Sequence, residues 1–404
     1  MATANNGTSN SSRNGSGRTG TGKSATGRTA TGRTSSGNTS TAGKKKLTKK
    51  QKARKKRKKM LLFGLEALVL VVLVVALFII QKADKVEKTE LDDIVVNEGV
   101  GKVDTSGNVE MNDISSAHME GYRNIALFGV DSRKGALGKG TLSDTIMIAS
   151  INEKTKEVKL VSVFRDTYLN IDGDSSYNKA NSAYSKGGPE QAINMLNRNL
   201  DLNISDFVTV GFSGVVDTVD ALGGVTIDVD DVELTHLNNY QIGTAEALGR
   251  DYTKLKGTGM QNLDGIQATS YCRIRYTKGD DFKRAERQRE VVQAIADEAK
   301  KASPKTLNKI ANSVFPQTAT SLELQEILDL IGDLPDYTIV SSDGFPFEDY
   351  RATGKIGAKG SCVIPADLQT NVSELHKFLF GATDYVPSTT VQEYSARISQ
   401  DTGK

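Results

Sequence analysis

Residues 125–163, IALFGVDSRKGALGKGTLSDTIMIASINEKTKEVKLVSV, decide the fold of this chain. They contain three apolar runs of strand length, Ile125–Val130, Thr145–Ile151 and Val158–Val163, separated by glycine-rich or charged residues. Short apolar runs bounded by turn residues predict buried β-strands. A charged residue borders each run, as happens where the ends of sheet strands face a cleft. The segment therefore predicts a buried sheet with polar side chains at its strand ends.

Downstream of this segment, strand and helix patterns alternate. Gly188-Pro189 opens a helical pattern, since proline is favoured in the first turn of a helix. A strand at Phe207–Phe212, a helix at Gly214–Leu222 and a strand at Val225–Val229 follow. This alternation predicts an α/β fold with helices on both sides of a mixed sheet. Three further helical patterns lie at Leu307–Val314, Leu322–Ile331 and Leu368–Phe380.

The formal net charge of +3 conceals two oppositely charged parts. Residues 1–59 hold 17 of the 52 Lys and Arg and no acidic residue, which leaves 35 basic and 49 acidic residues in the remainder. Between the parts, Met60–Ile80 carries one charge, Glu66, and has the length that crosses a bilayer. Because the basic residues directly precede this run, the positive-inside rule predicts a single-pass anchor with residues 82–404 outside the cell. A cleaved signal peptide is the alternative, but the run is too long for one and no small-residue cleavage site follows.

Two features of the N-terminal part resemble a nucleotide-binding site and a nucleic-acid-binding patch, but neither site is expected there. Gly17–Ser24, GRTGTGKS, fits the phosphate-loop pattern GxxxxGK[ST], which requires a strand before it and a helix after it. Its flanks are Gly, Ser and Thr repeats, so residues 1–43 are expected to be disordered and to hold no nucleotide. Membrane orientation and attraction to anionic lipid explain the lysine run at 44–59, so no nucleic-acid partner is expected.

A second informative stretch is Tyr271–Arg289, YCRIRYTKGDDFKRAERQR. Side chains alternate in Tyr271–Tyr276, which predicts a strand with Arg273 and Arg275 on one face. A turn then leads into a predicted helix. The alternative interpretation is an ordinary solvated helix with i,i+4 charge pairs.

On the predicted helix, polar and apolar residues continue along one face. Asp281 is placed to cap the helix, and Asp281, Arg284 and Gln288 follow the i, i+3, i+7 spacing of a single side. We therefore expect these three side chains to point toward one place, with an apolar floor behind them. The apolar continuation of the face is Val291 or Val292, then Ile295 and Ala299.

Several standard sites are not expected. His118, His236 and His376 are far apart in sequence and lack metal-ligand spacing, so we interpret each as a surface or structural residue. With so few histidines and no GxSxG motif, a Ser-His-Asp hydrolase is not predicted either. The two cysteines, Cys272 and Cys362, would pair as a disulfide outside the cell or remain two free thiols.

Arginine and aspartate at the predicted strand ends remain as candidates for chemistry. Arginine binds phosphate oxygens with two parallel hydrogen bonds and stays charged at any pH. Carboxylates hold Mg²⁺, which usually binds substrate phosphates as well. The pattern predicts a pyrophosphate or phosphodiester site with a divalent ion, although some of these residues would serve equally as turn, cap or ion-pair residues. The candidates are Asp131, Asp144, Arg165, Arg273, Arg275, Asp281 and Arg284.

At these residues the chain resembles the LytR-CpsA-Psr family of membrane-anchored phosphotransferases. The matching motifs are IALFGVDSR, SDTIMIASIN, SVFRDTY, NKANSAY, LGGV and YCRIRYTKGDDFKRAERQR, between about Tyr122 and Ala299. The resemblance implies a three-layer α-β-α fold and an extracellular enzyme. Such an enzyme moves a glycopolymer, such as teichoic acid or capsule, from a polyprenyl-pyrophosphate carrier onto peptidoglycan through a phosphodiester. A pyrophosphatase and a non-catalytic, membrane-tethered lipid-glycan binding or regulatory protein are the alternatives.

The resemblance also implies roles for single residues. Mg²⁺ or Mn²⁺ would lie on Asp131 and Asp144, and either Asp144 or Asp281 would accept the proton of the incoming hydroxyl. A lipid-filled apolar tunnel would lie beneath Gln288. Three residues depart from the family pattern, namely Leu142, Phe164 and Cys272. The pyrophosphate ligands would be Arg165, Arg273, Arg275, Arg284 and Gln288, with Arg165 and Arg275 also catalytic. Lys179 would either touch the phosphate as a further ligand or be an ordinary exposed loop lysine.

These features together predict seven segments along the chain. They are a disordered tail (1–43), a basic juxtamembrane segment (44–59), a transmembrane helix (60–80), an extracellular stalk (81–121), a catalytic domain (122–300), a C-terminal extension of unassigned role (301–382) and a flexible tail (383–404).

Overall fold

The computed structural model describes residues 86–404 except 99, 101, 104–108, 111–113, 132–136, 276 and 278. The predicted membrane span, the basic segment and the phosphate-loop pattern at Gly17–Ser24 all lie outside the described residues. Within the part of the chain that the structure describes, no helix is long and apolar enough to cross a membrane.

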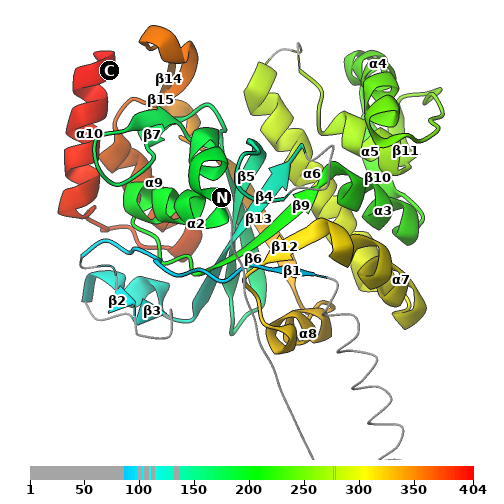
Figure 1. Cartoon of the computed structure of the whole chain (residues 1–404), viewed down its shortest axis with the longest axis horizontal. Helices are drawn as coiled ribbons and strands as arrows, with labels where there is room; N and C mark the ends of the chain where they lie inside the picture. Colours follow the sequence, from blue (N-terminus) through cyan, green and yellow to red (C-terminus); the bar gives the residue numbers. More distant parts are fainter. Residues whose placement is uncertain are drawn as a thin grey trace, which may run out of the picture. The chain divides into compact units, whose positions relative to one another are not determined.

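A mixed seven-stranded sheet forms the centre of the fold (Figure 1). In spatial order its strands are β1 (Glu87–Lys88), β12 (Thr318–Thr320), β9 (Asp206–Gly211), β4 (Tyr122–Val130), β5 (Ser143–Asn152), β6 (Glu157–Val163) and β13 (Thr338–Phe345). β4 runs parallel to β9 and antiparallel to β5, and β6 runs antiparallel to β5 and parallel to β13. The three strands predicted from residues 125–163 are therefore confirmed, and they lie next to one another in the sheet.

Helices cover both faces of this sheet, as predicted (Figure 1). Phe128 of β4 packs in a core with helices α2 (Asn181–Leu200), α9 (Leu368–Phe380) and α10 (Thr389–Thr402). Ile125 of the same strand faces the opposite side of the sheet, where it packs in a second core with Val292 of α6 (Asp280–Lys301). Alternation along each strand thus supplies apolar side chains to two separate cores.

A smaller lobe follows β9. Its elements are α3 (Phe212–Leu222), β10 (Val225–Val229), α4 (Asp231–Leu248), β11 (Gly259–Leu263) and α5 (Gly265–Tyr271). β10 and β11 form a two-stranded antiparallel sheet of their own, so the strand predicted at 225–229 exists but is not part of the central sheet. Leu237 of α4, Tyr271 of α5 and Val291 of α6 share the core of this lobe. The lobe therefore packs directly on the helix that carries the charged stretch.

The strand predicted at Tyr271–Tyr276 is wrong. Tyr271 ends helix α5, and Cys272 and Arg273 form a turn after it. Helix α5 begins with a capping box between Asp264 and Gln267, in which each side chain accepts from the other residue's backbone N–H. The alternation in 271–276 covers only six residues, and helix α5, which starts at Gly265, overrides it.

The C-terminal part belongs to the body rather than to an extension and a flexible tail. β12 and β13 are strands of the central sheet, and α9 covers one of its faces. In α10, Val391, Tyr394 and Ile398 are buried, with the i, i+3, i+7 spacing of an amphipathic helix. The expectation of a frayed end at 383–404 overlooked this spacing.

The described part of the predicted stalk also packs on the body. Ile94 is buried, and the Val95 N–H donates to Asn194 Oδ1 at 2.7 Å. Asn97 Nδ2 donates to Asp201 Oδ1 at 2.6 Å, at the end of α2. Residues 86–98 are thus held along α2, with β1 paired in the sheet.

Two of the histidines meet in space despite their separation in sequence. His118 Nε2 lies 2.8 Å from His376 Nδ1, and His376 Nε2 lies 2.9 Å from the Leu200 carbonyl oxygen. Because a carbonyl only accepts, His376 Nε2 carries a hydrogen and its Nδ1 accepts from His118. His376 is fully buried, and burial lowers its pKa to about 3. Its role is structural, as predicted.

This burial predicts a pH dependence of stability. The unfolded chain protonates His376 below a pH of about 6.5, whereas the folded chain does so only near 3, so stability falls as pH decreases through this window, by at most about 1.4 kcal/mol per pH unit. We expect His376→Gln to flatten the slope of unfolding free energy against pH in this window, measured by denaturant titration. His236→Gln is the matched control and should keep the wild-type slope. An unchanged slope in His376→Gln would contradict the assignment.

Candidate functional site

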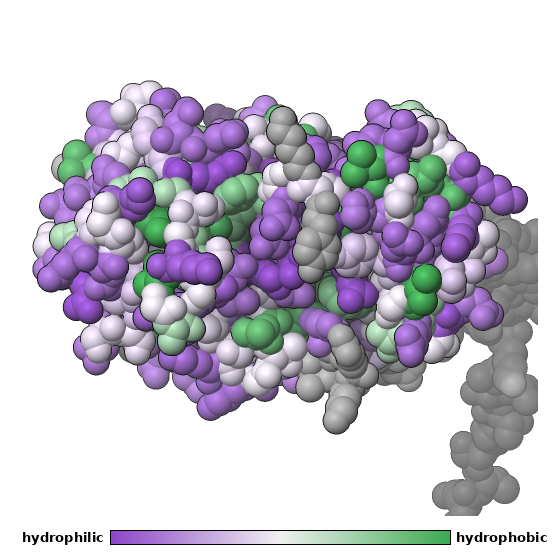
Figure 2. All heavy atoms as spheres, turned by 90° about the horizontal axis from the view of Figure 1, so that it is seen from above, coloured by the Kyte–Doolittle hydropathy of each residue, from purple (hydrophilic) through white to green (hydrophobic). Residues whose placement is uncertain are grey.

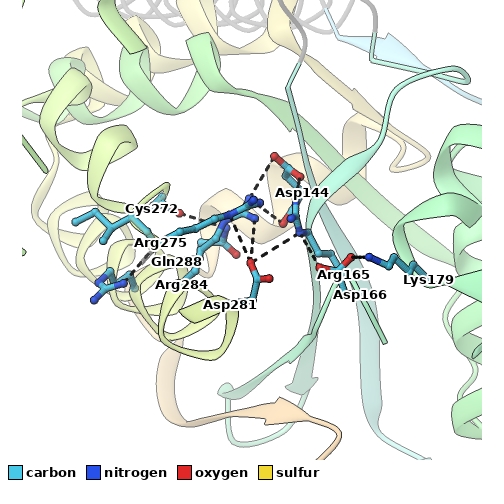
Figure 3. A network of polar contacts seen from close by, with 11 residues as sticks. Asp144, Arg165, Asp166, Lys179, Cys272, Arg275, Asp281, Arg284 and Gln288 are labelled. Atoms are coloured by element: carbon cyan, nitrogen blue, oxygen red, sulfur yellow. Dashed lines mark hydrogen bonds and ion pairs between the residues drawn. The ribbon is translucent and has the colours of Figure 1, made fainter. Parts of the chain in front are cut away.

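The backbone places Asp144 at an irregular point of the sheet. Gly129 pairs with Thr145 and Val130 pairs with Ser143, so Asp144 is the extra residue of a β-bulge in β5. A Cβ at Gly129 would lie 2.9 Å from the Thr145 side chain, so this close pairing needs glycine. Bulges redirect side chains, and here the Asp144 carboxylate points into a cluster of arginines (Figure 3).

Two arginines meet on the Asp144 carboxylate. Arg165 Nη1 lies 2.7 Å from Oδ1, and Arg284 Nη2 lies 3.2 Å from Oδ2. Burial alone would raise the pKa of Asp144, but the charges of Arg284 and Arg165 outweigh it and hold the pKa below its ordinary value. The Arg284 side chain is only 5% exposed, and burial lowers its pKa. The cluster therefore holds an ionised carboxylate between guanidinium groups that have lost much of their hydration.

A second carboxylate, Asp281, lies among three guanidinium groups. Its Oδ1 is 3.5 Å from Arg275 Nε, 3.8 Å from Arg284 Nη1 and 3.9 Å from Arg165 Nε. Asp281 Oδ1, Arg165 Nε and Arg284 Nε are buried atoms without a hydrogen-bond partner in the described part of the chain. Buried polar groups are normally paired, so this cluster has free hydrogen-bonding capacity for a charged ligand.

Asp281 does not cap α6, contrary to the sequence expectation. The N-cap is Gly279, which has φ = 99° and so adopts the left-handed conformation that glycine tolerates. Asp281 lies in the first turn instead, where the helix dipole favours a negative charge.

Lys179 reaches the cluster through Asp166. Its Nζ is 3.0 Å from Asp166 Oδ1, and Asp166 Oδ2 is 3.5 Å from Arg165 Nε (Figure 3). The loop that carries Arg165 and Asp166 is fixed by backbone hydrogen bonds from Asn181 N to Arg165 O at 3.0 Å and from Val363 N to Asp166 O at 2.9 Å. Asp166 thus supports Arg165 from one side while Asp144 holds it from the other.

Arg273 lies elsewhere. It donates from Nη1 to Thr244 Oγ1 at 2.8 Å, and its guanidinium lies 5.2 Å from the ring centre of Phe212. No strand places it beside Arg275, and the described contacts do not join it to the carboxylates of the cluster. Arg273 borders the apolar cavity described next.

An apolar cavity of about 270 Å³ lies beside the charged cluster, between the sheet and α6. Gln288, Val292 and Ile295 line it, so an apolar cavity lies where the family resemblance implied a tunnel beneath Gln288. Figure 2 shows the upper face of the molecule as mostly hydrophilic, with hydrophobic residues in small separate groups. Arg284 and Gln288 line both this cavity and the pocket at Asp144. Charged and apolar surfaces are therefore continuous at these two side chains.

Both cysteines are free thiols, so the structure does not form the disulfide considered from the sequence. Cys272 lines the apolar cavity, and burial raises its pKa to about 12. Its carbonyl oxygen lies 3.5 Å from Gln288 Nε2. Cys362 is buried in β15 (Ser361–Pro365), which pairs with β14 (Arg351–Lys355).

The two carboxylates that the resemblance implies as metal ligands follow or lie within adjacent strands. Asp131 follows the last residue of β4, and Asp144 lies in the bulge of the adjacent β5. Among the described residues, no group of three or more His, Cys, Asp or Glu is arranged to hold a metal. Mg²⁺ commonly takes only one or two carboxylates and completes its shell with water and phosphate. An ion held by Asp131 and Asp144 would therefore need water and a phosphate ligand to complete its shell.

Sequence reasoning missed one residue of this region, Arg287. It is 1% exposed and pairs with Glu233, which lies 54 positions earlier in the chain. An arginine within a run of charged residues looks the same in sequence whether it is buried or solvated. Only the position of Glu233 in space distinguishes the two cases.

Comparison with known proteins places this chain in a family. The model described as the LytR_cpsA_psr family matches residues 75–356. Polyisoprenyl-teichoic acid–peptidoglycan teichoic acid transferase TagU of Enterococcus faecalis is 32% identical over 198 residues, which are 49% of this chain and 58% of that protein. TagV of Bacillus subtilis, named as the same kind of transferase, is 28% identical over 275 residues, 66% of each chain. The matches thus span less than two thirds of the length of these relatives.

A solved structure agrees on the fold. The crystal structure of protein gbs0355 from Streptococcus agalactiae has a TM-score of 0.56 at 24% identity, covering 66% of this chain and 90% of that one. The family match continues past residue 300, in agreement with the place of β12 and β13 in the central sheet. The family model matches more than half of the residues of this chain, and the chain therefore belongs to the LytR-CpsA-Psr family.

Proposed function

We propose that this chain is an extracellular, membrane-anchored transferase. It moves a glycopolymer from a polyprenyl-pyrophosphate carrier onto peptidoglycan through a phosphodiester. The names of the TagU and TagV relatives support the reaction class and make teichoic acid the first polymer to test. The apolar run Met60–Ile80 behind a lysine-rich segment supports a single-pass anchor with the N-terminus in the cytoplasm.

The observation that carries this proposal is the junction of charge and apolar surface at Arg284 and Gln288. Both side chains border the arginine cluster and the cavity of about 270 Å³. A ligand with an anionic head and an apolar tail matches this junction. Arg165, Arg275 and Arg284 would hold the pyrophosphate, with Lys179 at the margin, and the polyprenyl chain would enter the cavity.

In the proposed reaction, the acceptor hydroxyl of peptidoglycan attacks the phosphorus next to the glycopolymer. The new O–P bond forms as the bond to the bridging oxygen breaks, and polyprenyl phosphate leaves. The arginines are charged and largely shielded from water before the ligand arrives, so they stabilise negative charge on the phosphates without reorganising.

Of the two candidate bases, the geometry favours Asp281 for the proton of the attacking hydroxyl. Both oxygens of Asp144 are engaged by arginines and its pKa is lowered, which makes it a weak base. The guanidinium nitrogens around Asp281 Oδ1 lie at 3.5 Å or more and donate no hydrogen bond to it in the described structure, so this oxygen can accept one from the hydroxyl. Asp131 and Asp144 would hold Mg²⁺ or Mn²⁺, which when bound supplies positive charge to the phosphates.

A reconstituted transfer assay tests this function. The full chain in detergent would receive a polyprenyl-pyrophosphate-linked teichoic acid precursor, peptidoglycan and Mg²⁺. Covalent attachment of polymer to peptidoglycan supports the proposal. Phosphate release without attachment would instead indicate a pyrophosphatase, and binding without turnover a non-catalytic lipid-glycan binding protein.

Filling the cavity should affect long carriers selectively. Ile295→Trp places a large ring in the space assigned to the lipid, and we expect KM for a long polyprenyl carrier to rise about tenfold or more, which corresponds to about 1.4 kcal/mol. Turnover of a short farnesyl carrier should change little. Ile331→Trp on α8 (Leu324–Gly332) is the control, since Ile331 is exposed and does not line the cavity. Equal losses for both carrier lengths would refute the lipid assignment.

A further inference from the structure

Arg287 is a fully buried arginine that the proposed reaction does not use. It lies one helical turn after Arg284 on α6, and its side chain is 2% exposed. Its Nε donates to Glu233 Oε1 at 2.8 Å, and the Glu233 side chain is 5% exposed. Removing one partner of a buried pair leaves an uncompensated charge, so the two residues are expected to be tightly coupled.

The two Nη atoms of Arg287 bind residues on either side of Arg275, between α5 and α6. Nη1 donates to the Ile274 carbonyl oxygen at 3.4 Å, and Nη2 donates to Thr277 Oγ1 at 3.0 Å. Arg275 lies between these two anchor points. Arg275 itself is in neither a helix nor a strand, so the position of its side chain depends on how Ile274 and Thr277 are held.

Glu233 is fixed in turn by its surroundings. It is the third residue of α4 and completes the capping box of that helix, since its Oε2 accepts from the Asp230 N–H at 3.2 Å. The Tyr271 hydroxyl lies 3.3 Å from Glu233 Oε1 and 2.6 Å from Glu290 Oε2. The start of α4, the end of α5 and the middle of α6 therefore meet around one guanidinium group.

We propose that the Arg287–Glu233 pair is a positioning device for Arg275. The pair holds Ile274 and Thr277, on either side of Arg275, so that the Arg275 guanidinium faces Asp281, 3.5 Å away, and Arg287 itself touches no substrate. This inference rests on the proposed function, in which Arg275 binds the pyrophosphate. It goes beyond that function because it assigns the geometry of the cluster to a buried pair outside it.

The substitution Thr277→Val tests this positioning role and is expected to leave the fold intact. Valine has nearly the shape of threonine but offers Arg287 no oxygen, and the Arg287–Glu233 pair remains. We expect the affinity of the full chain in detergent for farnesyl pyrophosphate, measured by calorimetry, to fall about five- to tenfold, equivalent to loss of about one hydrogen bond's net contribution. In an Arg275→Ala background, whose residual affinity comes from Arg165 and Arg284, the same substitution should cause no further loss. Thr235→Val on α4 is the matched control, because Thr235 is exposed and bonds only to Asp231 O in the described structure.

Arg287→Lys provides a second route. Lysine keeps a positive charge opposite Glu233, but its single ammonium cannot serve Glu233, Ile274 and Thr277 with the geometry of a guanidinium. If Arg287→Lys lowers the affinity of the parent chain but causes no further loss in the Arg275→Ala background, the result supports the proposal as well. Equal losses in both backgrounds, or no loss in either, would overturn it and leave Arg287 as a purely structural residue. Absence of farnesyl pyrophosphate binding by the parent chain would overturn the proposed pyrophosphate site itself, and the positioning role with it.

Discussion

Asp144→Asn is expected to slow glycopolymer transfer by about 10²–10³-fold, the loss typical of removing one group that organises a charged transition state. The substitution keeps the shape of the side chain but removes the charge that holds Arg165 and Arg284 at 2.7 and 3.2 Å. Both guanidiniums would then repel each other without a carboxylate between them. It also removes half of the proposed metal-binding pair.

The measurement is turnover in the reconstituted assay, together with the melting temperature of the variant. Asp228→Asn is the control, because Asp228 is an exposed residue of β10. Wild-type turnover in a folded Asp144→Asn variant would remove this residue from the site. A parallel loss in the control would point to a general effect on the fold.

Arg275→Ala is expected to lower turnover by about a hundredfold or more, because a charge-assisted contact to the pyrophosphate is lost in a site shielded from water. Its side chain is 29% exposed and its described ion pair, with Asp281, is long at 3.5 Å, so the fold should tolerate the change. Arg250→Ala is a matched control, since the Arg250 side chain is 34% exposed and pairs with Asp217 outside the cluster. Similar turnover of the two variants would exclude Arg275 from the reaction.

The sequence predicted those parts of the fold that depend on local pattern. The strands in residues 125–163 are apolar runs, and burial on both faces is what such runs require. The face formed by Asp281, Arg284 and Gln288 followed from helical spacing alone, and the structure confirms that Arg284 and Gln288 meet the cavity there.

Other parts depended on distant partners and could not be predicted. The alternation at 271–276 favoured a strand, but the capping box at Asp264 and the packing of Tyr271 in the lobe core decide for a helix. The pairing of Arg287 with Glu233 joins two helices, and neither residue has a local signature. In α10 the signal was local, because Val391, Tyr394 and Ile398 carry the i, i+3, i+7 spacing of a buried helix face.

The bulge at Asp144 has a consequence for how this site relates to its scaffold. Ser143 and Thr145 already face consecutive residues of β4, Val130 and Gly129, so the ladder on either side of Asp144 is regular. Taking out this one residue would leave an ordinary antiparallel pair of strands with every other side chain on its present face. Asp144 is thus one extra residue between two regularly paired positions of the sheet. Insertion or deletion of this single residue could therefore add or remove the carboxylate of the site without a change in the fold.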